Sequence, residues 1–248
     1  MNKLEELSAL KQELDNSSPL HQLTLESIIA DLRLKYTYNS NALEGNTLTI
    51  YETKAILENG ITIGGKSMRE HLEVINHDKA IDLLLNYVKL NESLELRSIL
   101  SFHEIILRQI NDEWAGRFRT IPVRVSGSKH LPIAPSKVYN TMDQYIINMK
   151  KLKQDLHSVE YAAIAHAHLA NIHPFVDGNG RTCRLVMNME LMKSGYPIVL
   201  INVNDRVEYC RLLELGDLSN DYTKFIDFIA ECTKRSLEIY LEAIKENI

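Results

Sequence analysis

Residues 171–184 read NIHPFVDGNGRTCR, and this stretch decides the fold that we expect. His173 precedes a proline, and the residue before a proline is driven out of the helical region, so a helix should end here. The turn formed by residues 177–180, Asp-Gly-Asn-Gly, then leads into a new helix. The stretch therefore predicts two helices joined by a short loop, with the loop at the N-terminus of the second helix.

The same stretch carries a set of residues that suits a phosphate. Free N–H groups and the dipole at a helix N-terminus favour an anion, and glycines let the backbone approach it closely. Arg181 and Arg184 are spaced i, i+3 on one helix face, and the guanidinium fork binds phosphate with two hydrogen bonds. Asp177 is suited to Mg²⁺ shared with substrate phosphates, and His173 is suited to accept the proton of an attacking hydroxyl. Together they describe nucleotidyl or phosphoryl transfer.

Each residue taken singly has a plainer interpretation. A histidine before proline often only ends a helix, and an aspartate before a helix is often an N-cap. A Gly-Asn-Gly run is often a simple turn, and two arginines at i, i+3 often form a solvated face. Phe175 is expected to be a core residue under either interpretation. Only the combination favours chemistry.

Working outward, most of the chain predicts helix. Capping boxes begin two helices, Thr49 with Glu52 and Ser67 with Glu70. The expected helices cover residues 23–38, 49–60, 67–90, 93–111, 136–153, 158–172, 179–194 and 222–245. Residues 116–135 break the pattern, because TIPVRVSG alternates apolar and polar residues and prolines follow, so we expect a short β-hairpin flap there. Without repeats or long linkers, residues 1–248 are predicted to form a single domain.

Composition excludes several classes of protein. The 248 residues are 45% hydrophobic and 25% charged, as in a globular protein. The net charge of −5 argues against a nucleic-acid partner. The three cysteines lack CxxC spacing, which argues against a disulfide framework or a zinc site built on them. No apolar run approaches the ~18 residues of a membrane span. We therefore expect a cytoplasmic protein without a membrane partner.

Residues 173–184 resemble the signature of the Fic family, H-x-F-x-(D/E)-G-N-G-R-x-x-R, at all eight specified positions of twelve. The resemblance implies an all-α Fic fold, a helical bundle with a short β-hairpin flap. It also implies an enzyme that moves AMP from ATP to a serine, threonine or tyrosine hydroxyl of a target protein, with self-modification expected as well. The phosphotransferase branch of the family carries a lysine-containing variant of this stretch, so Gly180 and Arg181 favour AMP transfer.

The resemblance also implies roles for individual residues. His173 is the expected general base, and Asp177 is the expected ligand of Mg²⁺ on ATP. The phosphate-binding residues are Gly178, Asn179 and Gly180 as an anion hole, with Arg181 and, for the γ-phosphate, Arg184. Further candidates are Asn188 and Tyr209 for the nucleotide, and the flap residues Val123, Arg124, Val125 and Ser126, whose backbone is suited to pair with the target as an added strand.

A second motif lies far upstream, where residues 40–46 read SNALEGN. It resembles the family's inhibitory motif (S/T)-x-x-x-E-(G/N), found in the group with an N-terminal inhibitory helix, class II. Ser40 and Glu44 share a helix face at i, i+4. We expect the Glu44 carboxylate to pair with Arg184 and to exclude the γ-phosphate. Residues 1–60 would then carry the inhibitory segment and residues 93–245 the Fic core.

Alternatives remain at this point. Glu44 could instead serve a de-AMPylating hydrolase that uses the same site. A metal-dependent hydrolase built on His166, His168 and His173 is disfavoured, because i, i+2 residues on a helix face different ways. A non-enzymatic helical interaction module would bind no ATP. The amphipathic first 20 residues suit either a homo-oligomer contact or packing on the core, and the sequence names no target protein.

Overall fold

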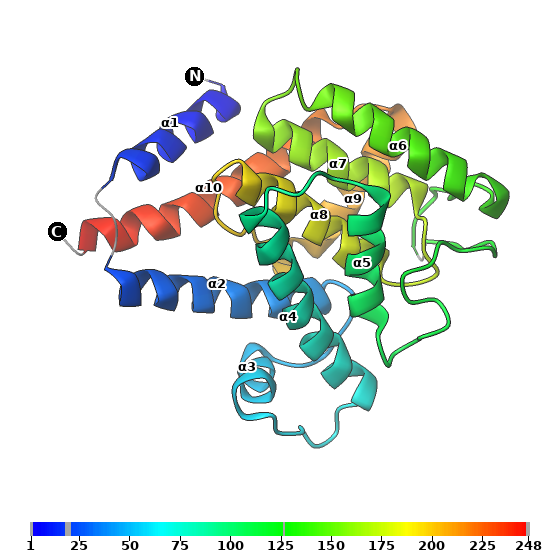
Figure 1. The fold of residues 1–248 in the computed structure, drawn as a ribbon, viewed down its shortest axis with the longest axis horizontal. Helices are drawn as coiled ribbons and strands as arrows, with labels where there is room; N and C mark the ends of the chain where they lie inside the picture. Colours follow the sequence, from blue (N-terminus) through cyan, green and yellow to red (C-terminus); the bar gives the residue numbers. More distant parts are fainter. Residues whose placement is uncertain (1, 18–20, 126, 247–248) are drawn as a thin grey trace.

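The computed structural model describes residues 2–17, 21–125 and 127–246, and within them the chain is all-α (Figure 1). The described part has α1 (Lys3–Asn16), α2 (Gln22–Ala42), α3 (Ile50–Asn59), α4 (Met68–Lys89), α5 (Leu96–Leu107), η1 (Pro135–Lys137), α6 (Val138–Leu152), α7 (Ser158–Ile172), α8 (Asn179–Lys193), η2 (Val203–Asp205), α9 (Arg206–Ser219) and α10 (Thr223–Glu246). None of the helices in this part is long and apolar enough to cross a bilayer.

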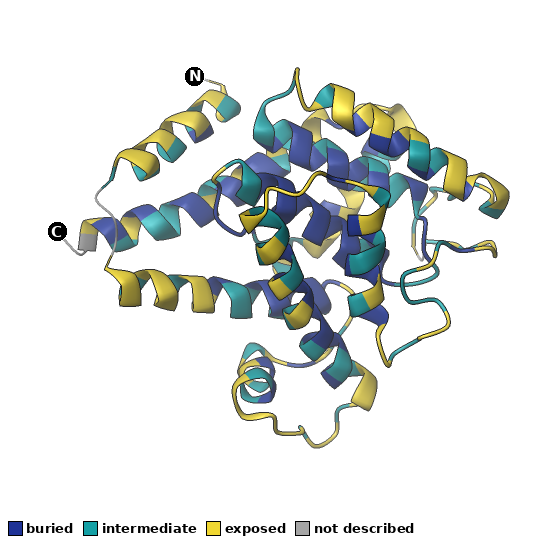
Figure 2. Cartoon of the chain, viewed as in Figure 1, coloured by how far each residue is buried: buried dark blue, intermediate teal, exposed yellow. Residues whose placement is uncertain are grey.

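Helices α7 and α8 form the centre of the bundle (Figure 2). Twelve of the fifteen residues of α8 are buried, from Asn179 to Leu191, so polar and apolar faces alike are covered by neighbours. Small side chains on α7 let α8 approach closely, and these are Ala162, Ala163, Ala165 and Ala167. The rigid α7–α8 pair fixes the position of the loop between them.

The loop between α7 and α8 follows the prediction. Helix α7 ends at Ile172, and His173 takes the left-handed conformation with φ 51° and ψ 60°. Gly178 has φ 75°, and α8 begins at Asn179. The side chain of Asn179 braces the loop, because its Oδ1 accepts from Phe175 N at 3.0 Å and its Nδ2 donates to Phe175 O at 2.9 Å.

Both capping boxes are confirmed, but other helix ends differ from the prediction. Helix α5 begins at Leu96 rather than at residue 93, because Glu95 and Ser98 form its N-terminal box. It ends at Leu107, and Gln109 follows with φ 61°. Helix α9 was not predicted. Helix α1 packs along α10 (Figure 1), and the Lys234 ammonium lies 2.6 Å from the Glu6 carboxylate.

The expected β-hairpin at residues 116–135 is wrong in its detail. Within its described residues the segment forms turns and irregular backbone without a strand, and Ser126 lies outside the described residues. Pro122, Pro132 and Pro135 remove backbone donors that a two-stranded ladder needs. The segment is called the flap below. It is held by contacts with the rest of the protein instead of by strand pairing.

Candidate active site

The structure brings Glu44 and Arg184 together from segments 140 residues apart. Glu44 follows the C-terminus of α2, and its Oε1 lies 2.7 Å from Nη2 of Arg184 on α8. Ser40 lies one turn earlier and is buried beneath the same guanidinium. Arg184 donates from Nε to Ser40 Oγ at 3.0 Å and from Nη2 to Ser40 O at 2.8 Å. Both predicted residues of the upstream motif therefore contact one arginine.

The Glu44 carboxylate also covers the N-terminus of α8. A Cβ atom at Gly180 would overlap Glu44 Oε1 and would lie 2.9 Å from Arg184 Nη1. Only glycine at this position lets the carboxylate approach the helix so closely. An anion thus occupies the place where the helix dipole and the free N–H groups attract one.

Charge stabilises this contact. Burial by itself raises the pKa of the Glu44 carboxyl, but the cations of Arg184 and Arg181 outweigh it and hold the pKa below its ordinary value. Burial likewise lowers the pKa of Arg184, and Glu44 more than restores it, so the pKa of Arg184 is raised. Both groups are charged at neutral pH. Arg184 is 1% exposed, whereas the Glu44 side chain keeps 36%, so the carboxylate is the part of the pair that can leave.

His173 is half-buried at the end of α7. Burial lowers the pKa of its imidazole to about 4, and the positive charge of Arg119 acts in the same direction. The imidazole is therefore neutral at pH 7, which a proton acceptor requires.

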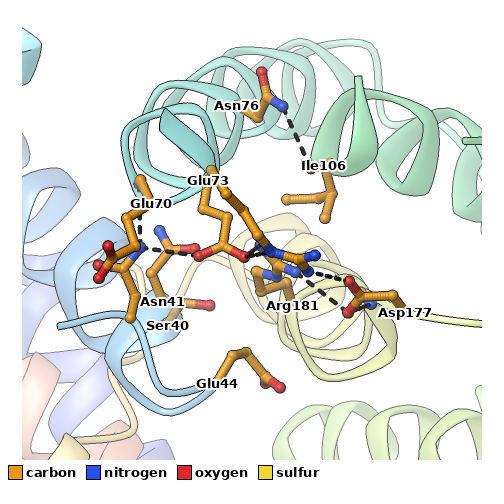
Figure 3. Close-up of polar contacts among 12 residues, drawn as sticks. Ser40, Asn41, Glu44, Glu70, Glu73, Asn76, Ile106, Asp177 and Arg181 are labelled. Carbon is orange, nitrogen blue, oxygen red and sulfur yellow. Dashed lines mark hydrogen bonds and ion pairs between the residues drawn. The ribbon is translucent and has the colours of Figure 1, made fainter. Parts of the chain in front are cut away.

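Asp177 lies two residues before α8 and contacts two arginines, of which Arg181 is labelled in Figure 3. Its Oδ1 accepts the Gly178 N–H at 2.6 Å and lies 3.6 Å from Arg181 Nη2. Its Oδ2 lies 2.5 Å from Nη2 of Arg69 on α4. Burial raises the pKa of Asp177, but Arg181 and the other donors bring it below its ordinary value, so the group is a carboxylate.

The donor set suits Mg²⁺ held largely by a nucleotide. Among residues 2–17, 21–125 and 127–246 there is no group of three or more histidine, cysteine, aspartate or glutamate side chains that could hold a metal alone. His166 is fully buried, and its Nε2 lies 2.9 Å from the Tyr209 hydroxyl. A single carboxylate beside a phosphate site is the set that Mg²⁺ uses when phosphates and water supply the other ligands.

Buried Arg181 has N–H groups that make no hydrogen bond. It is 1% exposed, with Nη1 3.5 Å from Glu73 Oε1, yet its Nε and Nη1 have no hydrogen-bond acceptor in the described part of the chain. A buried guanidinium with unused N–H groups is costly unless a ligand accepts from it. This observation fits a phosphate at the α8 N-terminus.

The N-terminal end of α4 contributes residues that the sequence reasoning missed. Glu73 accepts from Arg69 Nε at 3.1 Å and from Asn46 Nδ2 at 2.9 Å, so it connects residues 40–46 with the arginines (Figure 3). Glu73 and His77 are buried polar residues on the core-facing side of α4. That unusual polarity at helical spacing was the signal that could have revealed them.

His103 on α5 is a second missed residue. Its Nδ1 accepts the Gly116 N–H at 3.1 Å, so its Nε2 carries the proton and donates to Asp177 O at 2.9 Å. Burial lowers the pKa of His103 to about 4, which keeps this arrangement neutral. The ring stacks on Phe175 with centroids 3.6 Å apart, so Phe175 is the core residue that was expected.

Two predicted nucleotide contacts do not fit their placement. Asn188 is fully buried, with Oδ1 accepting from Val199 N at 2.7 Å and Nδ2 donating to Val199 O at 3.0 Å, so its amide anchors a neighbouring loop. Tyr209 is also buried, and its hydroxyl lies 3.4 Å from Arg184 Nη1 and 2.9 Å from His166 Nε2. Tyr209 supports Arg184 from behind instead of facing a ligand.

The remaining flap candidates lie at the surface. Val123 and Val125 are half-buried and Arg124 is exposed, which leaves this stretch open to a partner. The adjacent part of the flap is held to α9, because Glu214 accepts from Ser128 Oγ at 3.0 Å and from Lys129 N at 2.5 Å.

Comparison with known proteins gives consistent findings. A profile of the Fic/DOC family matches residues 93–191. The protein adenylyltransferase Fic of Nematostella vectensis is 38% identical over 229 residues, which is 91% of this chain and 52% of that protein. The protein of the same name from Drosophila melanogaster is 35% identical over 244 residues, 97% of this chain and 49% of that protein. The chain thus spans about half the length of these curated relatives.

Solved structures agree over nearly the whole chain. Fic-1, residues 134–508, from C. elegans superposes with a TM-score of 0.90 at 33% identity, covering 99% of this chain and 73% of that one. A Fic domain containing signaling protein from Bacteroides thetaiotaomicron gives a TM-score of 0.88 at 28% identity and covers 99% and 97%.

Proposed function

The chain belongs to the Fic/DOC family, and from this premise we propose that it is a self-inhibited protein adenylyltransferase. It transfers AMP from ATP to a hydroxyl side chain of a target protein, and Glu44 restrains the reaction. The observation that carries the proposal is the Glu44–Arg184 pair in front of the α8 N-terminus. A carboxylate there occupies the binding site that suits the terminal phosphate of ATP.

The chemistry follows from the positions of the side chains. The target hydroxyl attacks the α-phosphorus of ATP, the new oxygen–phosphorus bond forms, and the bond to the β-phosphate oxygen breaks to release pyrophosphate. Neutral His173 accepts the hydroxyl proton during the attack and later returns it to solvent. The base therefore has to lie beside the phosphate site, and the five-residue stretch from His173 to Asp177 keeps the two close along the chain.

The phosphates are held by the α8 N-terminus and its arginines. The N–H groups of residues 178–180 and the unused donors of Arg181 suit the α- and β-phosphates. Arg184 suits the γ-phosphate once Glu44 has left. Asp177 would hold Mg²⁺, which neutralises phosphate charge when it is bound.

These roles divide the chain into an inhibitory segment and a catalytic core. We place the inhibitory segment within residues 1–60 and the catalytic core within residues 93–245, in one domain. Residues 40–46 contact α8 through Arg184 and α4 through Glu73. The segment between the two parts includes Arg69, whose cation lies on the Asp177 carboxylate.

Arg69→Ala is expected to lower the Mg²⁺ concentration needed for nucleotide binding. Arg69 occupies the Asp177 oxygen that is not used by Gly178, so Mg²⁺ has to displace it. The Arg69 side chain is 56% exposed, so the expected change is roughly 1.4-fold to fivefold, as for an ion pair worth ~0.2–1 kcal/mol. Calorimetric titration of a non-hydrolysable ATP analogue at stepped Mg²⁺ measures it. Arg108→Ala, which removes a similarly exposed pair with Glu104, is the control. A higher Mg²⁺ requirement in Arg69→Ala would contradict the prediction.

The His173 imidazole is expected to titrate near pH 4 in the folded protein. Burial lowers the pKa to about 4, so the proton-accepting form persists well below pH 6.5. NMR of ¹³C-histidine-labelled protein between pH 4 and 8 checks this, with His173→Ala to assign the signal. The urea-unfolded chain serves as reference, because its histidines should titrate at about 6.5. Titration of the native signal at that reference value would refute the expectation.

A second activity at the same site is removal of AMP from the modified target. Its support is the Glu44 carboxylate, which is ionised, 36% exposed in its side chain and near enough to His173 to influence its pKa. Such a carboxylate is suited to orient a water molecule toward the AMP phosphorus. Incubation of AMP-labelled target with the wild-type protein and with Glu44→Gly separates the cases. Release of AMP by the wild type alone supports this activity, and its absence in both rules it out.

A further inference from the structure

The flap caps the helix that carries His173. The last carbonyl groups of a helix have no partner within it, and α7 ends two residues before Pro174. Flap residues donate to one of these groups and to the carbonyl groups of the two residues that follow the helix. His130 Nε2 donates to Asn171 O at 2.8 Å, Arg119 Nε donates to His173 O at 2.8 Å, and Arg119 N donates to Pro174 O at 2.9 Å.

Arg119 is the centre of this contact. It is 1% exposed, and its guanidinium also donates from Nη2 to Ile133 O at 2.6 Å and from Nη1 to Ile121 O at 3.3 Å. No carboxylate lies within ion-pair distance of it in the described part of the chain, and burial lowers its pKa. One planar cation thus joins both ends of the flap to the carbonyl of His173. Burial of a cation whose partners are neutral carbonyl groups, without a carboxylate, costs folding free energy.

The backbone conformation of His173 explains why these hydrogen bonds from Arg119, called the clamp below, are needed. His173 is not glycine, yet it has φ 51° and ψ 60°. A residue before proline prefers extended backbone, so this conformation is strained. Relaxation would rotate the His173–Pro174 peptide and would swing the imidazole away from its place. The hydrogen bonds from Arg119 to the carbonyl groups of His173 and Pro174 hold that peptide on both sides.

We propose that Arg119 is a positioning residue for His173, and that through it the flap and the base form one mechanical unit. The inference rests on the proposed function, because it takes His173 as the base. Arg119 contacts neither of the phosphate-binding arginines, whose side-chain partners are Ser40, Glu44, Glu73, Asp177 and Tyr209. Loss of the clamp should therefore impair turnover and leave nucleotide affinity unchanged. A merely structural residue would lower the two together through the folded fraction.

The test uses the Glu44→Gly protein, in which the restraint is absent, with Arg119→Lys added. Lysine keeps the charge, but its single ammonium cannot span the carbonyl groups of Ile121, Ile133 and His173 at once. We expect kcat for self-AMPylation to fall about 100-fold, as for a misplacement of the reacting groups by 1 Å, with the Kd of the ATP analogue within about threefold. Arg117→Lys, an exposed flap residue two positions earlier, is the matched control and should change neither quantity.

A spectroscopic readout separates this inference from the proposed function. The ¹³C signal of the His173 imidazole should shift in Arg119→Lys and stay in place in Arg117→Lys, whether or not AMP is transferred. If Glu44→Gly transfers no AMP, the proposed function is lost, and the His173 signal alone decides the role of Arg119. If Arg119→Lys does not fold, as judged by circular dichroism, Arg119→Gln takes its place. Unchanged turnover with an unchanged signal, or a Kd that weakens in step with kcat, would overturn the inference.

Discussion

Glu44→Gly is expected to raise self-AMPylation from ATP by about 100-fold or more, because a misplaced phosphate can cost a factor of that size. Removal of the carboxylate frees Arg184 Nη2 and opens the space against Gly180. The γ-phosphate can then bind the guanidinium with two hydrogen bonds, which places the α-phosphorus in line with the attacking hydroxyl. Intact-mass spectrometry of the protein after incubation with ATP and Mg²⁺ measures the AMP adduct directly.

Two further variants separate charge from shape in this result. Glu44→Gln keeps the size of the side chain and loses its charge, so it should activate less than glycine does. Glu58→Gly changes an exposed glutamate at the end of α3, whose ion pair with Lys54 spans 3.8 Å, and should leave the rate unchanged. ATP binding without any increase in labelling by Glu44→Gly would refute the role assigned to Glu44.

His173→Ala in the Glu44→Gly background should abolish most of the gained activity. Removing a general base costs about 10² to 10⁴ in rate, and no other described histidine lies on the loop that leads into α8. ATP affinity should persist, since the phosphate contacts come from residues 178–184. Radiolabelling with α-phosphate-labelled ATP gives the rate, and calorimetry gives the affinity.

An exposed histidine provides the matched control for that loss. His21 precedes α2, far along the chain from the loop, and His21→Ala should retain the full rate of the Glu44→Gly protein. If the His173 variant kept that rate as well, the base would have to be another group. Equal loss of rate and of ATP affinity would instead indicate that His173 shapes the binding site.

The sequence predicted the α7–α8 loop well because its determinants are local. Proline after His173 disfavours helix at the preceding residue, and glycine at 178 permits the left-handed turn before α8, so both helix ends follow from local residues. The pairing of Glu44 with Arg184 was different, since it joins residues 140 positions apart and was expected only from the family resemblance. Composition and periodicity do not reveal which residues so far apart in the sequence come into contact.

Other features of the site depended on packing that no local pattern encodes. Arg69, His103 and Arg119 read as ordinary members of helices or of the flap, and their roles come from which carbonyl or carboxylate lies opposite. The predicted hairpin failed for a related reason. Alternation of apolar and polar residues indicated strand, but the donors of the flap go to the α7 terminus and to Glu214 instead.

The central claim is that the Glu44 carboxylate and the γ-phosphate compete for Arg184. Crystal structures of the wild-type protein and of Glu44→Gly, each with Mg²⁺ and a non-hydrolysable ATP analogue, test it most directly. The account predicts that Glu44 stays on Arg184 in the wild type with the γ-phosphate elsewhere, and that in the variant the γ-phosphate binds the Arg184 guanidinium. A γ-phosphate bound to Arg184 in the wild type with Glu44 still in place, or one remote from Arg184 in the variant, would contradict it.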